Sequence, residues 1–182
     1  MRLALFKRSQ VSHGWTLIEL LMVAVIVAAL ATIAFPAFSF LKEKAGFAAC
    51  VSHLRSLHTC FTNYMLDNEM VWPQVPVEQF AASEDETKEW KWWNDTLKPY
   101  GSSKALWICP ADSDTQDQMH AEGVEFAGSY IPTEFDNVPN TAFKWSTQPW
   151  LLERGSLHGK KQGPNLLMPD GTVRQGHAFF PQ

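Results

Sequence analysis

The residue types best suited to acid–base chemistry lie near the C-terminus, where His158 precedes Asp170 and Gly171. A histidine beside a carboxylate can accept and return a proton near neutral pH. The chain has no Gly-x-Ser-x-Gly, no His-Glu-x-x-His and no phosphate-binding glycine loop, and its six histidines are scattered. We therefore expect no enzyme activity, and we expect His158 and Asp170 to form a hydrogen bond that fixes a hairpin.

A group of acidic residues could bind a metal. Asp112, Asp114 and Asp117, with Glu122 nearby, place several carboxylates in one short segment. Calcium prefers clustered oxygen ligands, so these residues are a candidate calcium site. They lack the spacing and the glycine of an EF-hand loop, and a solvated acidic loop is the alternative that we favour.

The three cysteines, Cys50, Cys60 and Cys109, allow one disulfide at most. Cys50 and Cys60 are ten residues apart on a predicted helix. That spacing separates them by about 15 Å along the axis, which is too far for a bond. Cys109 could pair with either of them in an oxidising compartment, and three reduced, buried cysteines are the alternative.

The eight tryptophans are numerous for a chain of 182 residues. Six of them could form a sugar-binding surface, but filling the core of a small domain is the explanation that we favour. The six are Trp90, Trp92, Trp93, Trp107, Trp145 and Trp150.

The N-terminal segment has a charge pattern typical of membrane targeting. Residues 1 to 14 hold three basic residues and no acid, whereas the remainder holds 12 basic and 19 acidic residues. The 22 residues from Leu20 to Leu41 carry no charge, and as a helix they would extend about 33 Å, enough for a bilayer core of ~30 Å. We expect a single span with a cytoplasmic N-terminus. The overall charge of −4 gives no reason to expect nucleic-acid binding.

Glu19 stands at the start of this apolar stretch, with no lysine or arginine within one helical turn. A carboxylate within a bilayer costs about 2.5–3.5 kcal/mol on insertion scales, so such a group usually has a partner. A free α-amine created at Trp15 by cleavage would supply a cation, in the same chain or in a neighbouring copy. The alternative is a hydrated Glu19 at the membrane interface, favoured by the helix N-terminus.

The string GWTLIELL, residues 14 to 21, resembles the processing signature of type IV prepilins and type II secretion pseudopilins. The resemblance implies that a prepilin peptidase cuts between Gly14 and Trp15, that the new N-terminus is methylated, and that Glu19 directs assembly. It also implies three segments: a leader over residues 1–14, a transmembrane and assembly helix over 15–41, and an extracytoplasmic head over 42–182.

A second resemblance is to pseudopilin-like proteins that are abundant in planctomycetes. CVSHLRSL at residues 50–57 is similar to the helix that follows their membrane segment, and CPAD at 109–112 is similar to a motif in the middle of their chains. NLLMPDGTV at 165–173 is similar to their C-terminal histidine and Asp-Gly motif, with two more residues between His158 and Asp170 than that motif has.

A long helix must position the N-terminal residues. Apolar residues recur at spacings of three and four from Phe47 to Tyr64, which predicts a helix over residues 16–66 with one apolar stripe. We expect a bend near Pro36, and two helices broken at this proline are the alternative.

Shorter elements must position the C-terminal residues. Ser83 and Glu86 give a capping-box signal for a helix over 84–97. Apolar runs predict strands at 105–109, 126–131, 165–168 and 172–179, with a turn over 169–172. The expected fold class is therefore α+β, with a long pilin-like helix packed on a small antiparallel sheet.

These features together predict a structural subunit of a type IV pilus-like or type II secretion pseudopilus filament. The family implies these partners: other copies of the chain, other pseudopilins, the prepilin peptidase, an inner-membrane platform protein, an ATPase and membrane lipid. It also implies insertion in the bacterial inner membrane with the head outside, and a filament in the periplasm or at the cell surface after assembly. The alternative is a single-pass, membrane-anchored binding domain such as a lectin or a receptor.

Overall fold

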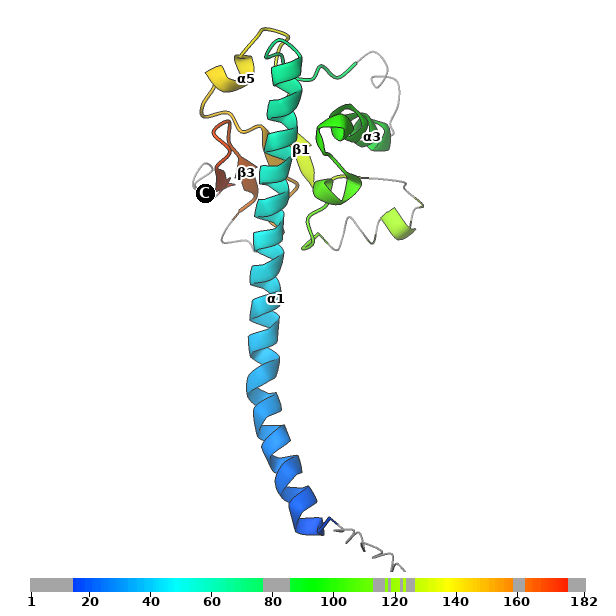
Figure 1. The fold of residues 1–182 in the computed structure, drawn as a ribbon, viewed down its shortest axis with the longest axis vertical. Helices are drawn as coiled ribbons and strands as arrows, with labels where there is room; N and C mark the ends of the chain where they lie inside the picture. The colour runs from blue at the N-terminus through cyan, green and yellow to red at the C-terminus, as the bar shows by residue number, and fades with distance from the viewer. Residues whose placement is uncertain are drawn as a thin grey trace, which may run out of the picture. The chain divides into compact units, whose positions relative to one another are not determined.

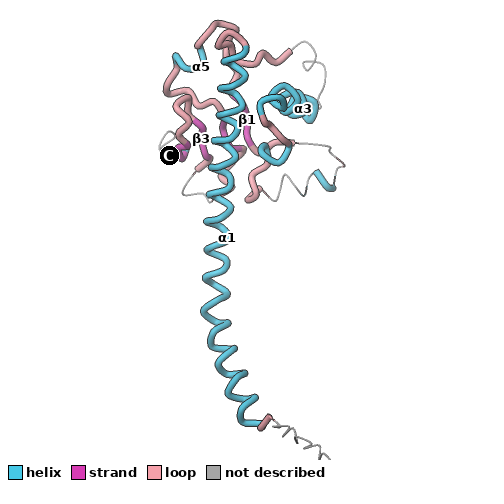
Figure 2. The backbone as a smooth tube through the Cα atoms, in the orientation of Figure 1, coloured by secondary structure: helices cyan, strands magenta, loops and turns pink. Residues whose placement is uncertain are grey.

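The computed structural model describes residues 15–76, 86–112, 117, 119–121, 123, 127–158 and 163–176. The chain divides into two compact units, Met1–Leu41 and Lys42–Gln182, and we call the second one the head. One helix, α1 (Leu17–Asp67), begins in the first unit and ends in the head (Figure 1). Apart from α1 and one shorter helix, loops make up most of the described head (Figure 2).

In the first unit, α1 begins at Leu17 and continues as one helix past Pro36. The prediction of a single helix over 16–66 is confirmed, and the alternative of two helices is wrong. The described residues include 19 large apolar side chains that are exposed, and 15 of them lie in this unit. Among the described residues, no helix is found that is both long enough and apolar enough to cross a membrane.

In the head, α1 buries one stripe of side chains, as the spacing of apolar residues predicts. The fully buried members are Cys50, Leu54, Leu57, Phe61 and Met65. The helix ends at Asp67, and the N–H of Met70 then donates a hydrogen bond of 2.7 Å to the carbonyl of Met65. This bond satisfies one of the carbonyl groups that a helix end leaves unpaired.

A four-stranded antiparallel sheet packs against this stripe, with its strands in chain order. The strands are β1 (Tyr130–Pro132), β2 (Leu151–Glu153), β3 (Asn165–Leu167) and β4 (Val173–Gln175). The register places Tyr130 opposite Glu153. The α+β class is thus confirmed, and so are the predicted strands at 165–168 and, in part, at 126–131 and 172–179; residues 124–126 and 177–179 lie outside the described set.

One predicted strand is wrong, and one strand was not predicted. Residues 104–107 form the short helix η2 (Lys104–Trp107) in place of a strand at 105–109. The segment makes single hydrogen bonds and no ladder: Ser129 N–H donates to the Trp107 carbonyl at 2.8 Å, and Cys109 N–H donates to the Ser129 hydroxyl at 2.9 Å. Trp107 and Cys109 therefore reach the core without strand pairing. The strand without a prediction is β2.

Three further helices lie wholly within the described residues: α3 (Glu86–Leu97), η1 (Lys98–Tyr100) and α5 (Thr141–Lys144). The helix predicted over 84–97 is confirmed from Glu86 onward, and residues 84 and 85 lie outside the described set. Trp90, Trp93 and Leu97 of α3 are buried, so this helix covers the core with one face.

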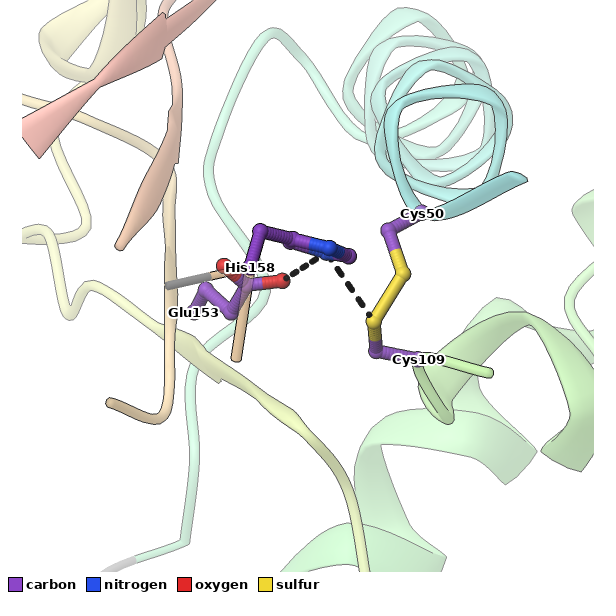
Figure 3. A group of neighbouring side chains, drawn as sticks. All are labelled: Cys50, Cys109, Glu153 and His158. Carbon is purple, nitrogen blue, oxygen red and sulfur yellow. Dashed lines mark hydrogen bonds and ion pairs between the residues drawn. A yellow bond between two sulfur atoms is a disulfide. The ribbon is translucent and has the colours of Figure 1, made fainter. Parts of the chain in front are cut away.

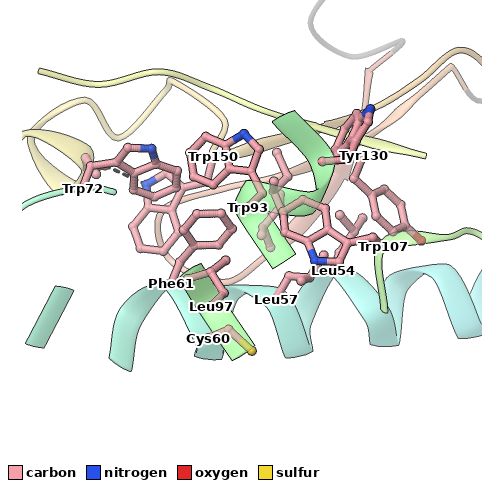
Figure 4. Close-up of a cluster of buried hydrophobic side chains, with 14 of the residues drawn as sticks. Leu54, Leu57, Cys60, Phe61, Trp72, Trp93, Leu97, Trp107, Tyr130 and Trp150 are labelled. Carbon is pink, nitrogen blue, oxygen red and sulfur yellow. Dashed lines mark hydrogen bonds between the residues drawn. The ribbon is translucent and has the colours of Figure 1, made fainter. Parts of the chain in front are cut away.

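Tryptophan side chains fill the core of the head (Figure 4). Trp72, Trp93, Trp107 and Trp150 are at most 2% exposed. The ring of Phe61 stacks on Trp72 with 4.4 Å between the ring centroids. The favoured explanation, that the tryptophans fill the core, is confirmed for Trp90, Trp93, Trp107 and Trp150, which are buried. Trp92 is partly buried against this core, and Trp145 is 56% exposed.

Candidate functional site

The first turn of α1 holds the predicted assembly residue, Glu19. Its carboxylate accepts hydrogen bonds from the backbone N–H and the hydroxyl of Thr16, at 2.9 and 2.8 Å. In return, Glu19 N–H donates to the hydroxyl of Thr16 at 3.3 Å. This reciprocal pair is a capping box, which satisfies N–H groups at a helix start. The Thr-x-x-Glu spacing is a signal that the sequence analysis missed.

The two predicted processing residues come directly before this capping box in the sequence. Trp15 is 76% exposed, directly before Thr16. Gly14 lies outside the described residues. A cut after Gly14 would therefore leave a new amine one residue away from the backbone N–H that already binds the carboxylate of Glu19.

The C-terminal Asp-Gly turn is not joined to His158, and the predicted hydrogen bond between His158 and Asp170 is wrong. Asp170 is exposed and accepts hydrogen bonds from the N–H and the hydroxyl of Thr172, at 2.9 and 2.6 Å. These two bonds are also the main reason why the pKa of Asp170 lies below its usual value. Asp170 is therefore a turn-forming residue.

A different histidine fixes this turn. The Nε2 atom of His58, on α1, lies 3.0 Å from the carbonyl oxygen of Pro169. The His58 ring also stacks on Trp150, with 4.6 Å between the centroids. Gly171 has a φ of +77°, and a Cβ there would lie 3.3 Å from the His58 ring. Sequence reasoning missed His58 because only the fold brings α1 beside the turn.

His158 belongs instead to a buried cluster with Cys50, Cys109 and Glu153 (Figure 3). Cys50 and Cys109 form a disulfide, with 5.1 Å between their Cα atoms. Cys60 is a buried free thiol, so one of the pairings that the sequence left open is now assigned. The disulfide joins α1 to the loop that follows η2.

The Nε2 atom of His158 lies between the disulfide and the carboxylate. It is 3.4 Å from the Sγ atom of Cys109 and 3.2 Å from the Oε1 atom of Glu153 (Figure 3). Its Nδ1 atom is buried and has no hydrogen-bond partner within the described residues, so no second contact fixes the tautomer of the ring. The His158 ring lies almost perpendicular to the ring of Phe47, with 5.2 Å between the centroids.

Glu153 sits at the end of β2 and is only 3% exposed. Its Oε2 atom accepts the backbone N–H of Asn165 at 3.0 Å, and the side-chain amide of Asn165 lies 3.4 Å from Oε1. Burial raises the pKa of Glu153 to about 7, and the hydrogen bonds from Asn165 offset part of this effect.

Burial also acts on the groups around Glu153. It lowers the pKa of His158, which the charge of Glu43 partly counteracts. It raises the pKa of Tyr130, and the charges of Glu153 and Asp112 add to that effect. Burial in the cluster therefore disfavours the charged forms of these side chains. Near neutral pH the His158 imidazole is neutral, and the carboxyl group of Glu153 is close to the midpoint of its titration.

The acidic residues proposed for calcium are described only in part. Asp112 is 2% exposed, and its charge acts on Glu153 and Tyr130. Asp117 is exposed. Asp114 and Glu122 lie outside the described residues. Asp112 is thus not part of a solvated loop, and the calcium site stays a prediction.

A scan against protein-family models and searches of curated proteins and of solved structures found no match to this chain.

Proposed function

We propose that the chain is a structural subunit of a type IV pilus-like or type II secretion pseudopilus filament. In this proposal a prepilin peptidase removes residues 1–14, and residues 15–41 act as the membrane and assembly helix. The head then lies outside the inner membrane. The observation that carries the proposal is the start of α1: the helix begins three residues after Gly14, and Glu19 is held in its first turn.

The surface of the first unit supports assembly through α1. Soluble monomers rarely expose large contiguous apolar surface, and such surface marks contact with protein or lipid. The side chains of Leu17, Ile18, Leu20 and Leu21 are each more than half exposed, and they lie on different sides of the helix. Copies of the same helix in a filament would cover this surface, and lipid would cover it beforehand. The span itself stays a prediction, since five side chains between residues 20 and 41 are not described.

The charge of Glu19 supports an order in which leader cleavage comes before assembly. The sequence offers no lysine or arginine between Glu19 and Lys42. The capping box uses the N–H and the hydroxyl of Thr16, and neither of them is a cation. A methylated amine at Trp15 would be the first positive charge near this carboxylate, and it would appear only after cleavage. Uncleaved chains would therefore lack the pairing that sets the position of one subunit against the next.

The test is co-expression of the full chain with a prepilin peptidase, followed by mass spectrometry of the N-terminus. We expect N-methylated Trp15 as the first residue, and we expect Gly14→Arg to keep the leader. Ser12→Ala is the matched leader variant and should be processed normally. An intact N-terminus in the presence of an active peptidase would contradict the proposal and would favour the anchored binding domain.

One observation favours that second candidate. A hollow of about 270 Å³ in the head is lined by Trp145, Gln148 and Asp136, with Thr133 and Glu134 among its other residues. An exposed aromatic ring beside carboxylate and amide groups is the kind of surface that sugars contact. A glycan array with the full chain and with Trp145→Ala would test it; binding that the variant loses would support a lectin-like role.

A further inference from the structure

The cluster of Cys50, Cys109, Glu153 and His158 contains more polar groups than a structural disulfide needs. A buried carboxylate and a buried imidazole each lose hydration, and replacing such a pair by apolar residues is often neutral or stabilising. The pair lies directly against the Sγ atom of Cys109 (Figure 3). A shared function of the four side chains would explain why the head buries a carboxylate and an imidazole at the expense of their hydration.

Their ligand atoms are arranged as a metal site would require. One atom from each of the four residues lies within 4.8 Å of all the others, and all four residues are buried. They come from α1, from the loop after η2, from β2 and from the turn after β2, so the fold converges on this point. Two sulfurs, one imidazole nitrogen and one carboxylate oxygen are ligands that zinc accepts in tetrahedral geometry.

The surroundings of the ligands also fit. The backbone N–H of Asn165 holds the Oε2 atom of Glu153 at 3.0 Å, which orients the carboxylate. Such outer contacts fix ligand geometry in metal sites. Phe47 packs against the His158 ring and shields it. The Cα atoms of Cys50 and Cys109 are 5.1 Å apart, so side-chain rotation alone can bring their sulfurs to the separation of about 3.8 Å that two thiolates have on one zinc ion.

We propose that these four residues form a redox-gated zinc site. In the disulfide state the sulfurs are bonded to each other and offer no thiolate, so the site is closed to metal. A dithiol reductant opens it: the disulfide takes up two electrons and two protons, and the reductant becomes a cyclic disulfide. Zn²⁺ then displaces both thiol protons and binds the two thiolates, the Nε2 atom of His158 and one oxygen of Glu153.

The test uses the full chain in mild detergent, reduced with dithiothreitol and freed from it under anaerobic conditions. Cobalt(II) is the first probe, because thiolate-bound tetrahedral cobalt has a charge-transfer band and intense visible bands. We expect one equivalent to bind to the reduced chain and none to the oxidised chain, and we expect Zn²⁺ to abolish the bands. A reduced chain that gives no thiolate–cobalt band would overturn the proposal.

Variants assign the ligands. Cys60→Ser removes the free thiol outside the cluster and should leave the titration unchanged. His158→Gln should weaken zinc binding by at least about tenfold, since even the loss of an outer contact has an effect of this size. This variant keeps both cysteines, and its oxidised form can be checked for native tryptophan circular dichroism. Equal zinc affinity in wild type and in His158→Gln would contradict the assignment, and so would binding that depends on Cys60.

Reduction itself could loosen the head, and this effect is part of the test. If the tryptophan signal of the reduced chain is lost, one equivalent of Zn²⁺ should restore it, because metal binding then drives folding. A reduced chain that neither binds zinc nor refolds with it would overturn the proposal. None of these results depends on leader cleavage, so this proposal and the filament proposal can fail separately.

Discussion

Glu153 is an acid that the head buries beside a histidine. Burial raises its pKa to about 7 from the 4.5 of an exposed glutamate. At pH values between these two, the folded protein keeps a proton that the unfolded chain releases. The contribution of Glu153 to stability is therefore fully present below pH 4.5 and is lost as the pH rises through 7.

For the oxidised protein, we expect Glu153→Gln to be more stable than wild type at pH 8 by about 3 kcal/mol and to match it at pH 4. Glutamine has the shape of the protonated acid and cannot ionise. Urea unfolding followed by tryptophan fluorescence at both pH values measures the difference. The lowered pKa of His158 destabilises both proteins below pH 6.5 and cancels in the comparison. Parallel pH profiles for the two proteins would contradict the expectation.

Gly171 is the residue that allows the C-terminal turn to approach α1. Gly171→Ala should cost about 1–2 kcal/mol of unfolding free energy for the left-handed backbone, and more because the new Cβ meets His58 at 3.3 Å. Gly155 is the matched control: its φ is +82° and a Cβ there meets nothing within 4 Å. We expect the difference between the two variants to disappear in a His58→Ala background, as a double-mutant cycle would measure. Equal costs in wild type would show that the contact is irrelevant.

Glu19, in the first turn of α1, has two roles that substitutions can separate: its oxygen caps the helix, and its charge can pair with an amine. In a capping box, glutamine can replace glutamate at the third helical position, because its oxygen still accepts the hydrogen bonds. Glu19→Gln therefore keeps the cap and removes the charge. Thr16→Ala keeps the charge and removes the cap, at about 1 kcal/mol.

If pairing with the amine of Trp15 drives assembly, Glu19→Gln should abolish filaments, and Thr16→Ala should reduce them only moderately. Thr32→Ala is the control, because the Thr32 hydroxyl donates a hydrogen bond within the helix, to the carbonyl of Ala29 at 2.7 Å. Electron microscopy and sedimentation of sheared filaments give the yields. Normal filaments from Glu19→Gln would refute the charge pairing.

The elements differ in how far the sequence predicts them, and the reason is their length. The ends of α1 are predicted to within one residue, because an uncharged apolar run over residues 20–41 is followed by apolar residues at helical spacing from Phe47 to Tyr64. The strands have three residues each, too few to show an alternating pattern. β2 was missed because Leu151-Leu152-Glu153 ends in a charged residue, which only the fold shows to be buried.

The site was harder to predict than the fold. Glu19 could be singled out because its chemistry is local: an acid at the edge of an apolar run. The partners of His158 and of the Asp-Gly turn come from segments far away in the sequence, and spacing along the chain carries no information about such contacts. Proximity in the sequence therefore predicts a pair of His158 and Asp170, whereas in the structure it is His58 that contacts the turn, at the carbonyl oxygen of Pro169.

At the scale of the whole head, the disulfide closes a loop of 59 residues. A cross-link of this span restricts the unfolded chain, and the entropy model gives about 4 kcal/mol for it. We expect Cys50→Ser, measured with a zinc chelator present, to lower the unfolding free energy by about this amount. A reductant should then have no further effect. Cys60→Ala should keep its full response to reductant, since this cysteine is outside the bond.

Cys50 is the first fully buried side chain of α1 among those described. Tension that travels up the helix would therefore meet a covalent link before it reached Leu54, Leu57 and Phe61. Packed side chains separate at forces that leave a covalent bond intact. In the oxidised head the Cys50–Cys109 disulfide would therefore bear the force, whereas in the reduced head α1 would detach from the core starting at Cys50. Pulling single molecules by the N-terminus in an optical trap would show a higher rupture force for the oxidised form.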